Sequence, residues 1–212
     1  MSIRIASFNL YKFSGYTHKE ESIIAQMIDD YEIDIIAIQE IFAEEAMKRI
    51  LRCLGTNWEG RWASPTPHYG SSLSAEGYAF IWNKNKFRLS ENKNKKVFEP
   101  HIFSQYSHKD FKKLVRDPLY GRFTLISNEQ VEIRLLNTHI MYSIDKTIND
   151  SDIRDASTDR LGDITMRKQE FEILATRLLP KIDNKDYDAQ LNERDGICRR
   201  PYTILLGDYN LN

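Results

Sequence analysis

The chain has 212 residues, of which 41% are hydrophobic and 29% are charged, and its formal net charge at pH 7 is −1. This composition is typical of a globular protein with one sizeable core, and it excludes a disordered chain. The balanced charge excludes a protein that holds nucleic acid by overall charge alone, so a polyanion would have to meet local patches. No apolar stretch has the length of a membrane span, and we expect no membrane partner.

The N-terminal sequence and the two cysteines indicate in which cellular compartment the protein is expected. The opening "MSIRIASFNLYKFSG" has no uninterrupted apolar segment and no small-residue cleavage site, so it lacks the pattern of a secretory signal. The two cysteines, Cys53 and Cys198, lie far apart and make no disulfide framework. We therefore expect a cytoplasmic protein, although export by a route without a signal peptide stays open.

Strand signals run through the whole chain. Short apolar runs rich in isoleucine, valine, leucine and aromatic residues predict strands at 3–8, 34–38, 77–82, 86–90, 119–126, 131–137 and 202–206. Between some of these runs, the apolar spacing changes to the period of a helix. The two polar stretches 141–162 and 183–200 are predicted to be loops.

Three helices are predicted among these strands. Thr17 and Glu20 fit a capping box, and an apolar stripe follows as far as Tyr31. A second helix is predicted at 43–54, ended by Gly55, and a third begins after Asp163 and stops before Pro180. This order predicts one α/β (or α+β) domain spanning residues 1–212, in which two sheets form a β-sandwich flanked by helices.

Polar side chains follow the apolar runs where the strands end. Asn9 follows the first run, Gln39 and Glu40 follow the second, and His139 and Asp208 each follow a later one. Asn137 precedes His139 by two residues, and Asn210 follows Asp208 by two, so each pair points to one side of an extended chain. If the strand ends lie level, these side chains meet at one edge of the sandwich, where a site would be built.

The residue types at this edge suit phosphate ester cleavage. Glu40 offers the hard oxygen ligands that Mg²⁺ or Mn²⁺ prefers, and such a cation neutralises a phosphate. Asn9 and Asn210 form hydrogen bonds without adding negative charge beside an anion, and His139 is the residue type that transfers protons near neutral pH. Each residue alone has an ordinary explanation as a turn, surface or core residue. Their combination at four strand ends favours a site.

The same residues resemble the endonuclease/exonuclease/phosphatase superfamily. Its motifs are matched in order and spacing by "ASFNLYKF" at 6–13, "DIIAIQEI" at 34–41, "NTHI" at 137–140 and "GDYN" at 207–210. "SAEGYAFIWNKNKF" at 74–87 and "VRDPLYGRF" at 115–123 are similar to the deoxyribonuclease I branch. The resemblance implies a DNase I-like fold of two sheets flanked by helices.

The resemblance also implies roles for individual residues. Mg²⁺ or Mn²⁺ would be held by Glu40 with support from Asn9, and Asp208 and Asn210 would position the attacking water and the phosphate. Glu76 would orient His139 as a proton-transfer pair, within hydrogen-bonding distance of it. Contacts with the substrate phosphate are expected from Arg116, Asn137, Asn210 and Tyr78.

The sequence departs from the family pattern at its end. The family continues beyond "GD-x-N" with an Asp-His pair and further strands, and the 212-residue sequence has neither. We therefore expect the fold to lack its C-terminal strands, an apolar sheet edge to be exposed, and the gene to encode roughly 40–90 further residues. We expect little nuclease activity from residues 1–212 alone, and no stable protein partner unless one completes the sheet.

Three functions remain open from the sequence. The first is a metal-dependent endonuclease acting on DNA, with local phosphate contacts from Lys84, Lys86, Arg88, Lys112 and Lys113 in addition to Arg116. The second is a phosphatase or phosphodiesterase acting on inositol phosphates, lipid head groups or nucleotides. The third is a binding or scaffold protein that kept the fold and lost the reaction.

Overall fold

The computed structural model describes residues 2–14, 21–65, 76–92, 94–103, 114–140, 164–183 and 200–210. Its helices and strands follow one another as β1 (Ile5–Phe13), α1 (Glu21–Asp30), β2 (Ile35–Ile41), α2 (Glu44–Leu54), β3 (Trp58–Ala63), β4 (Tyr78–Asn83), β5 (Phe87–Leu89), β6 (His101–Ile102), β7 (Leu119–Leu125), β8 (Val131–His139), α3 (Ile164–Ile173), the π-helix η1 (Leu174–Leu178) and β9 (Arg200–Asp208). None of the helices in these ranges is both long enough and apolar enough to span a membrane.

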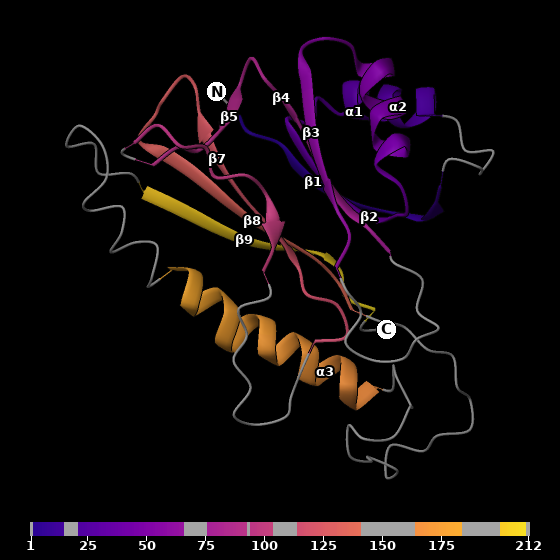
Figure 1. Ribbon diagram of the computed structural model, residues 1–212, viewed down its shortest axis with the longest axis vertical. Coiled ribbons are helices and arrows are strands. Elements are labelled where there is room, and N and C mark those ends of the chain that lie inside the picture. Colours follow the sequence, from indigo (N-terminus) through magenta and orange to yellow (C-terminus); the bar gives the residue numbers. More distant parts are fainter. Residues whose placement is uncertain are drawn as a thin grey trace.

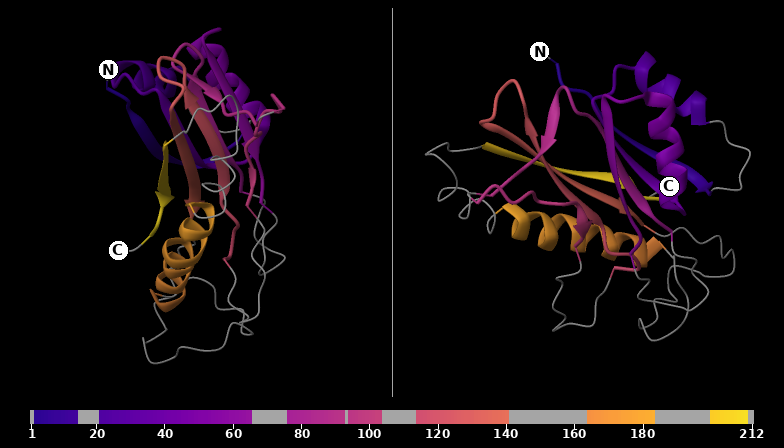
Figure 2. Two further views of the ribbon diagram at one scale, coloured as in Figure 1. Left: turned by 90° about the vertical axis from the view of Figure 1, so that its left-hand side faces the viewer. Right: turned by 45° about the horizontal axis from the view of Figure 1, so that its top comes forward.

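The strands form two sheets that face each other (Figures 1 and 2). The first sheet has the order β1-β2-β4-β3, and the second has the order β5-β7-β8-β9, with β6 paired to β7. In each sheet one parallel pair, β1 with β2 or β8 with β9, adjoins antiparallel pairs. Both parallel pairs run toward the same end of the sandwich, where Asn9 pairs with Gln39 and His139 pairs with Asp208.

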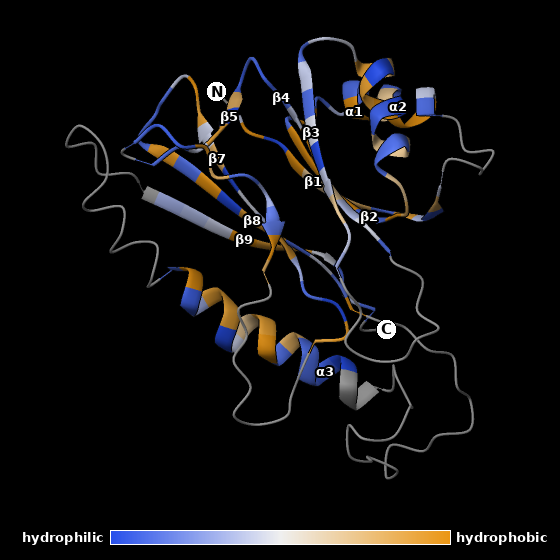
Figure 3. Cartoon of the chain, in the orientation of Figure 1, coloured by the Kyte–Doolittle hydropathy of each residue, from blue (hydrophilic) through white to orange (hydrophobic). Residues whose placement is uncertain are grey.

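Helices cover the outer face of both sheets. The helices α1 and α2 pack on the first sheet through Ile28, Met47 and Ile50, and α3 with η1 packs on the second through Leu174 and Leu178. The core between the sheets contains mainly aromatic and branched side chains, such as Phe80, Trp82, Phe123 and Leu135. Apolar and hydrophilic residues alternate along α2 and α3, because each helix buries one side against its sheet (Figure 3). The predicted two-sheet sandwich flanked by helices is confirmed.

Three local predictions need correction. The strand β3 was absent from the prediction because its sequence, WEGRWA, mixes charged residues with tryptophan and glycine instead of forming an apolar run. The two-residue strand β6 is too short to give a sequence pattern. The third helix does not stop before Pro180, because residues 179–183 continue it. The π turn of η1 ends two residues before Pro180, and such turns accommodate irregularities in a helix. The predicted N-cap Thr17 lies outside the described residues.

An ion triad is buried on the outer face of the second sheet, at the end away from the paired strand termini. Glu132 on β8 accepts hydrogen bonds from Arg122 at 3.1 Å and from Arg134 at 2.7 Å, and all three residues are almost fully buried. Burial opposes the charged carboxylate, but the guanidinium groups of Arg122 and Arg134 outweigh it and lower the pKa of Glu132. Arg122 also stacks on Phe98, with 3.8 Å between its guanidinium carbon and the ring centroid.

One edge strand of each sheet, β1 in the first and β9 in the second, lies on the same side of the sandwich. Within the described ranges, β1 pairs only with β2, and β9 pairs only with β8. Exposed aromatic side chains lie on both strands, with Tyr202 54% and Phe8 38% exposed. By contrast, every residue of the central strand β2 is buried.

Candidate active site

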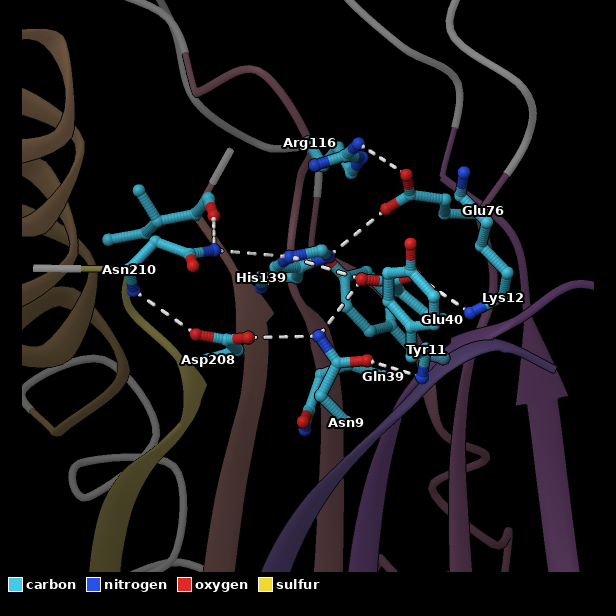
Figure 4. A network of polar contacts seen from close by, with 12 residues as sticks. Asn9, Tyr11, Lys12, Gln39, Glu40, Glu76, Arg116, His139, Asp208 and Asn210 are labelled. Carbon is cyan, nitrogen blue, oxygen red and sulfur yellow. Dashed lines mark hydrogen bonds and ion pairs between the residues drawn. The ribbon is translucent and has the colours of Figure 1, made fainter. Parts of the chain in front are cut away.

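Polar side chains from four strands meet where the two parallel pairs end. Asn9 comes from β1, Glu40 from β2, His139 from β8 and Asp208 from β9, and Figure 4 shows these side chains pointing toward one another. Asn210, two residues after the end of β9, completes the group. The strand-end residues chosen from the sequence are therefore brought together from distant parts of the chain.

Two glycines allow the backbone to reach this arrangement. Gly77 follows Glu76, and a Cβ atom at position 77 would lie 2.2 Å from the carbonyl oxygen of Ile41. Gly207 precedes Asp208 with a φ angle of +147°, and a Cβ atom there would lie 1.9 Å from the carbonyl oxygen of Thr138. Any side chain at either position would push apart the strands that carry the site.

Asn9 links the carboxylates of the two sheets. Its Nδ2 donates to Glu40 Oε1 and to Asp208 Oδ2, both at 2.9 Å. Its Oδ1 accepts the backbone N–H of Tyr11 at 2.8 Å, which fixes the orientation of the amide. Glu40 Oε2 accepts the backbone N–H of Lys12 at 2.8 Å. Asn9 therefore orients the two carboxylates, and its predicted support of a metal ion stays a prediction.

The donor set at this point fits a small, hard cation. The Asn9 amide nitrogen, which carries partial positive charge, lies between the carboxylates of Glu40 and Asp208. Mg²⁺ usually takes one or two protein carboxylates and completes its coordination with water and substrate phosphate. Over the described part of the chain, no three histidine, cysteine or acidic side chains group closely enough to hold a metal ion. Two carboxylates suit Mg²⁺ or Mn²⁺ better than a structural zinc ion, which needs four ligands.

A second chain of contacts ends at His139. The side chain of Arg116, only 3% exposed, forms an ion pair with Glu76, with 2.7 Å between Nη2 and Oε1. The other oxygen of Glu76 lies 3.0 Å from His139 Nδ1. This is the hydrogen-bonding distance expected for the pair, while its catalytic role stays a prediction. With Nδ1–H donated to Glu76, the neutral imidazole presents an unprotonated Nε2.

His139 Nε2 faces the other group of polar residues. It lies 3.4 Å from Asn210 Nδ2 and 3.8 Å from Glu40 Oε1. The imidazole is 7% exposed, and the hydroxyl of Tyr78 accepts the backbone N–H of His139 at 3.1 Å. Contacts with Glu76, Tyr78 and Asn210 thus hold the histidine, and its Nε2 faces Glu40 and Asn210.

Asn210 is fixed by backbone and helix contacts. Its Nδ2 donates to the carbonyl of Ile140 at 2.7 Å, and its backbone N–H donates to Asp208 Oδ1 at 3.1 Å. On α3, Arg167 donates to the Asn210 carbonyl at 2.7 Å, and Glu170 accepts the backbone N–H of Val115 at 2.6 Å. Two residues one helical turn apart on α3 therefore hold Asn210 and the segment beside Arg116.

Some predicted substrate contacts lie elsewhere. Asn137 is fully buried, donates to the carbonyls of Ile38 and Ala79 and accepts Gln39 Nε2, so it links the two sheets instead of reaching a phosphate. Tyr78 is 1% exposed, burial raises the pKa of its hydroxyl, and that group contacts the His139 backbone. Both predicted phosphate contacts are wrong for this arrangement. Arg116 contacts Glu76, and its predicted contact with substrate stays a prediction.

The predicted basic patch is also displaced. Lys84 and Lys86 follow β4 at the end opposite Tyr78, and Lys86 pairs with the buried Asp34. Arg88 pairs with Glu91 and Glu129 near the same far end. The predicted contacts at Lys112 and Lys113 fall outside the described residues. None of the three basic residues placed by the structure lies at the strand ends that carry His139.

The sequence reasoning missed other residues at the site. Tyr11 and Lys12 lie at a bulge of β1, and both have left-handed φ angles, as do Glu40 and Asn210. These four are among six described non-glycine residues with positive φ, and such strain concentrates at functional sites. Arg167 was missed because a contact between a helix and a distant strand leaves no local pattern.

Comparison with known proteins adds to this geometry. The sequence matches no protein-family model and no curated protein. The structure is similar to a mannosyl-6-phosphatase, Bt3783, from Bacteroides thetaiotaomicron VPI-5482, with a TM-score of 0.62, 19% identity and coverage of 99% of this chain and 66% of that one. An endonuclease/exonuclease/phosphatase family protein from Bacteroides thetaiotaomicron gives a TM-score of 0.60, 19% identity and coverage of 98% and 63%. This chain has the endonuclease/exonuclease/phosphatase fold.

A further structure with this fold holds nucleic acid. D. rerio TDP2, complexed with single strand DNA product, has a TM-score of 0.56 and 13% identity, and the match covers 99% of this chain and 61% of that one. This chain therefore spans somewhat less than two thirds of the length of these three structures. The resemblance predicted from the motifs is confirmed at the level of the fold.

Proposed function

We propose that this protein is a phosphoester hydrolase that depends on Mg²⁺ or Mn²⁺ and cleaves phosphodiester bonds in DNA. The observation that carries the proposal is the chain Arg116–Glu76–His139, which directs His139 Nε2 toward Glu40 and Asn210. Attack of water on a phosphate requires a proton acceptor and groups that hold a cation and the phosphate, and here a histidine lies beside two carboxylates and two amides.

The residues divide into a cation-binding group and a proton-transfer group. Glu40 and Asp208 would hold the divalent cation, with Asn9 fixing both carboxylates. When bound, the cation neutralises the phosphate and the charge that develops on it. Asn210, held by Ile140 and Arg167, offers its amide to the phosphate or to the attacking water.

His139 performs the proton transfer in this proposal. The water oxygen forms a bond to phosphorus, the bond from phosphorus to the leaving oxygen breaks, and His139 Nε2 takes the proton that the water loses. Solvent supplies a proton to the leaving oxygen. Glu76, hydrogen bonded to Nδ1, stabilises the imidazolium that forms, and the ion pair with Arg116 holds Glu76 in place.

The experiment is a nicking assay on the complete gene product with supercoiled plasmid, in Mg²⁺, in Mn²⁺ and in EDTA. We expect nicking with either metal and none in EDTA. His139→Ala should lower the rate by about 10²- to 10⁴-fold, the range for loss of a general base. Glu129→Gln, which changes an exposed carboxylate at the far end of β7 and β8, is the control and should cut at the wild-type rate.

A second candidate is a phosphatase that acts on a phosphate monoester. It is favoured by the similarity to a mannosyl-6-phosphatase and by the location of Lys84 and Lys86 away from the strand ends, where they cannot support a long nucleic acid. A panel of sugar phosphates and nucleotides assayed for released phosphate separates the two. Metal-dependent release from the panel without plasmid nicking would replace the nuclease proposal. Inactivity on all of these substrates would refute both.

A further inference from the structure

The bulge in β1 places two side chains beside the candidate active site. Asn9 pairs with Gln39 and Phe13 pairs with Ile41, so residues 10–12 of β1 lie opposite the single residue Glu40 of β2. Bulges next to active sites change the direction of a side chain. Here Tyr11 has a φ angle of 45° and Lys12 one of 54°, conformations that a non-glycine residue rarely adopts.

The bulge is held by the residues assigned to the cation. The Tyr11 N–H donates to Asn9 Oδ1 and the Lys12 N–H donates to Glu40 Oε2, each at 2.8 Å. Lys12 is therefore bonded directly to the Glu40 carboxylate proposed to hold the cation, and Tyr11 is bonded to Asn9, which in turn contacts that carboxylate. A group that contacts either side chain belongs to the part of the substrate directly next to the scissile phosphate.

Both side chains are exposed to solvent. Tyr11 is 67% exposed, although aromatic rings usually bury most of their surface. The Lys12 side chain is also exposed, and its Nζ lies 5.6 Å from the Tyr11 ring centroid. Among the described residues, no carboxylate forms an ion pair with Lys12 Nζ. Figure 4 shows the Tyr11 ring in front of Glu40 and the Lys12 side chain extending toward Glu76.

We infer that Tyr11 and Lys12 form a nucleotide subsite, in which Tyr11 stacks on the nucleobase next to the scissile phosphate and Lys12 contacts a backbone phosphate. This deepens the proposed function and rests on it. An exposed aromatic ring and an ammonium group side by side match the two parts that every nucleotide combines, a planar base and a charged phosphate. Stacking on one ring tolerates any base, so the subsite predicts little sequence preference.

The test uses two oligonucleotides that each contain one cleavable phosphodiester among resistant phosphorothioate linkages. In one, normal nucleosides flank the cleavable bond, and in the other, abasic tetrahydrofuran residues replace them. Tyr11→Ala should raise KM for the first about tenfold, the loss expected for one stacked base, and should change KM for the second by less than about twofold. Tyr11→Phe keeps the ring and should resemble the wild type with both.

Lys12→Met tests the phosphate contact. It should lower kcat/KM for both oligonucleotides and reduce the slope of log(kcat/KM) against log salt by about 0.7, the value for one contact with a single strand. Tyr31→Ala is the matched aromatic control, because Tyr31 is also 67% exposed but follows α1 at the far end. Lys84→Met is the exposed lysine control.

A binding measurement separates failure of the subsite from failure of the proposed reaction. In EDTA, an oligonucleotide that carries 2-aminopurine should lose fluorescence on binding, because stacking quenches that base. Tyr11→Ala should abolish the quenching, and Tyr31→Ala should not. If the wild type quenches but cleaves no oligonucleotide, the subsite stands and the hydrolase proposal fails. Absence of quenching by the wild type, or equal KM changes with base-bearing and abasic substrates, would overturn the inference.

Discussion

Replacing Glu76 by glutamine removes the carboxylate that contacts both Arg116 and His139. The wild-type oxygens lie 2.7 Å from Arg116 Nη2 and 3.0 Å from His139 Nδ1. Glutamine has nearly the same shape, and its carbonyl oxygen still accepts one hydrogen bond. The substitution therefore removes the negative charge between Arg116 and His139 while leaving the side-chain packing in place.

The burial of Arg116 sets the size of the expected loss of stability. The Arg116 side chain is 3% exposed, and in the described part of the chain its Nε and Nη1 have no hydrogen-bond partner. Breaking a buried ion pair costs about 3–5 kcal/mol, and we expect about 3 kcal/mol because Glu76 keeps some contact with solvent. For a domain of this size, that corresponds to a fall in Tm of roughly 6–12 °C. The kcat should fall about 100-fold, because the imidazolium loses its counter-charge.

Thermal unfolding followed by circular dichroism, together with steady-state kinetics, measures both effects. Glu99→Gln is the control, since it removes the same group from an exposed pair with Arg61 and should cost less than about 1 kcal/mol. The double variant Glu76→Gln/Arg116→Met removes both buried charges, so it should recover at least half of the lost Tm while kcat stays low. The reasoning is refuted if Glu76→Gln unfolds at the same temperature as Glu99→Gln and keeps kcat within twofold of the wild type.

Three further substitutions test other parts of the structure. Glu40→Gln should lower activity by orders of magnitude and weaken Mn²⁺ binding in calorimetric titrations, yet shift Tm by only a few degrees, since the amide loses about one hydrogen bond; unchanged Mn²⁺ affinity would contradict the assignment. Arg167→Met removes the bond to the Asn210 carbonyl and should lower kcat about tenfold with little change in KM; recovery with Arg167→Lys would support positioning by this donor. Glu132→Gln should cost about 3–5 kcal/mol of stability at neutral pH, because Arg122 and Arg134 are left buried without their carboxylate. Since the folded-state pKa of Glu132 is lowered, this contribution is fully present above the unfolded pKa and is lost as the pH falls through the folded pKa. The difference in unfolding free energy between wild type and Glu132→Gln should therefore stay constant from about pH 5 upward and shrink below about pH 4; a difference that persists unchanged at lower pH would contradict the lowered pKa.

The elements that the sequence predicts well are those whose pattern is local. The strand β2 consists of apolar residues that are buried on both faces, so an uninterrupted run marks it. The gathering of Asn9, Glu40, His139 and Asp208 toward one end of the sandwich could also be predicted, because each lies one or two residues after such a run. The two-residue spacing predicted that Asn137 and His139 lie on the same face of their strand, as they do in β8.

The two-residue spacing does not show which residue on that face reaches the site and which is buried between the sheets. Asn137 lies two residues before His139 along β8 and is covered by the first sheet, where its amide donates hydrogen bonds to the carbonyls of Ile38 and Ala79. The bulge at Tyr11 was not predictable either, because the apolar run that marks this strand ends at residue 8, before the bulge begins. Its cause is the hydrogen bonds that Asn9 and Glu40 make with the backbone, and these require the fold to be formed first.

The strain at the site and its chemistry have a common origin. Left-handed φ angles at Tyr11, Lys12 and Glu40 cost conformational free energy, and in the structure the N–H groups of this bulge are bonded to the Asn9 amide and the Glu40 carboxylate. Those same two side chains are the ones assigned to the cation, so the hydrogen bonds that stabilise the bulge also orient the cation-binding oxygens. A substitution that relaxed the bulge would free Glu40 to change direction, and one that moved Glu40 would release the bulge. The proposed subsite and the cation-binding group are therefore one structural unit, joined through backbone N–H groups that a side-chain substitution at Tyr11 leaves in place.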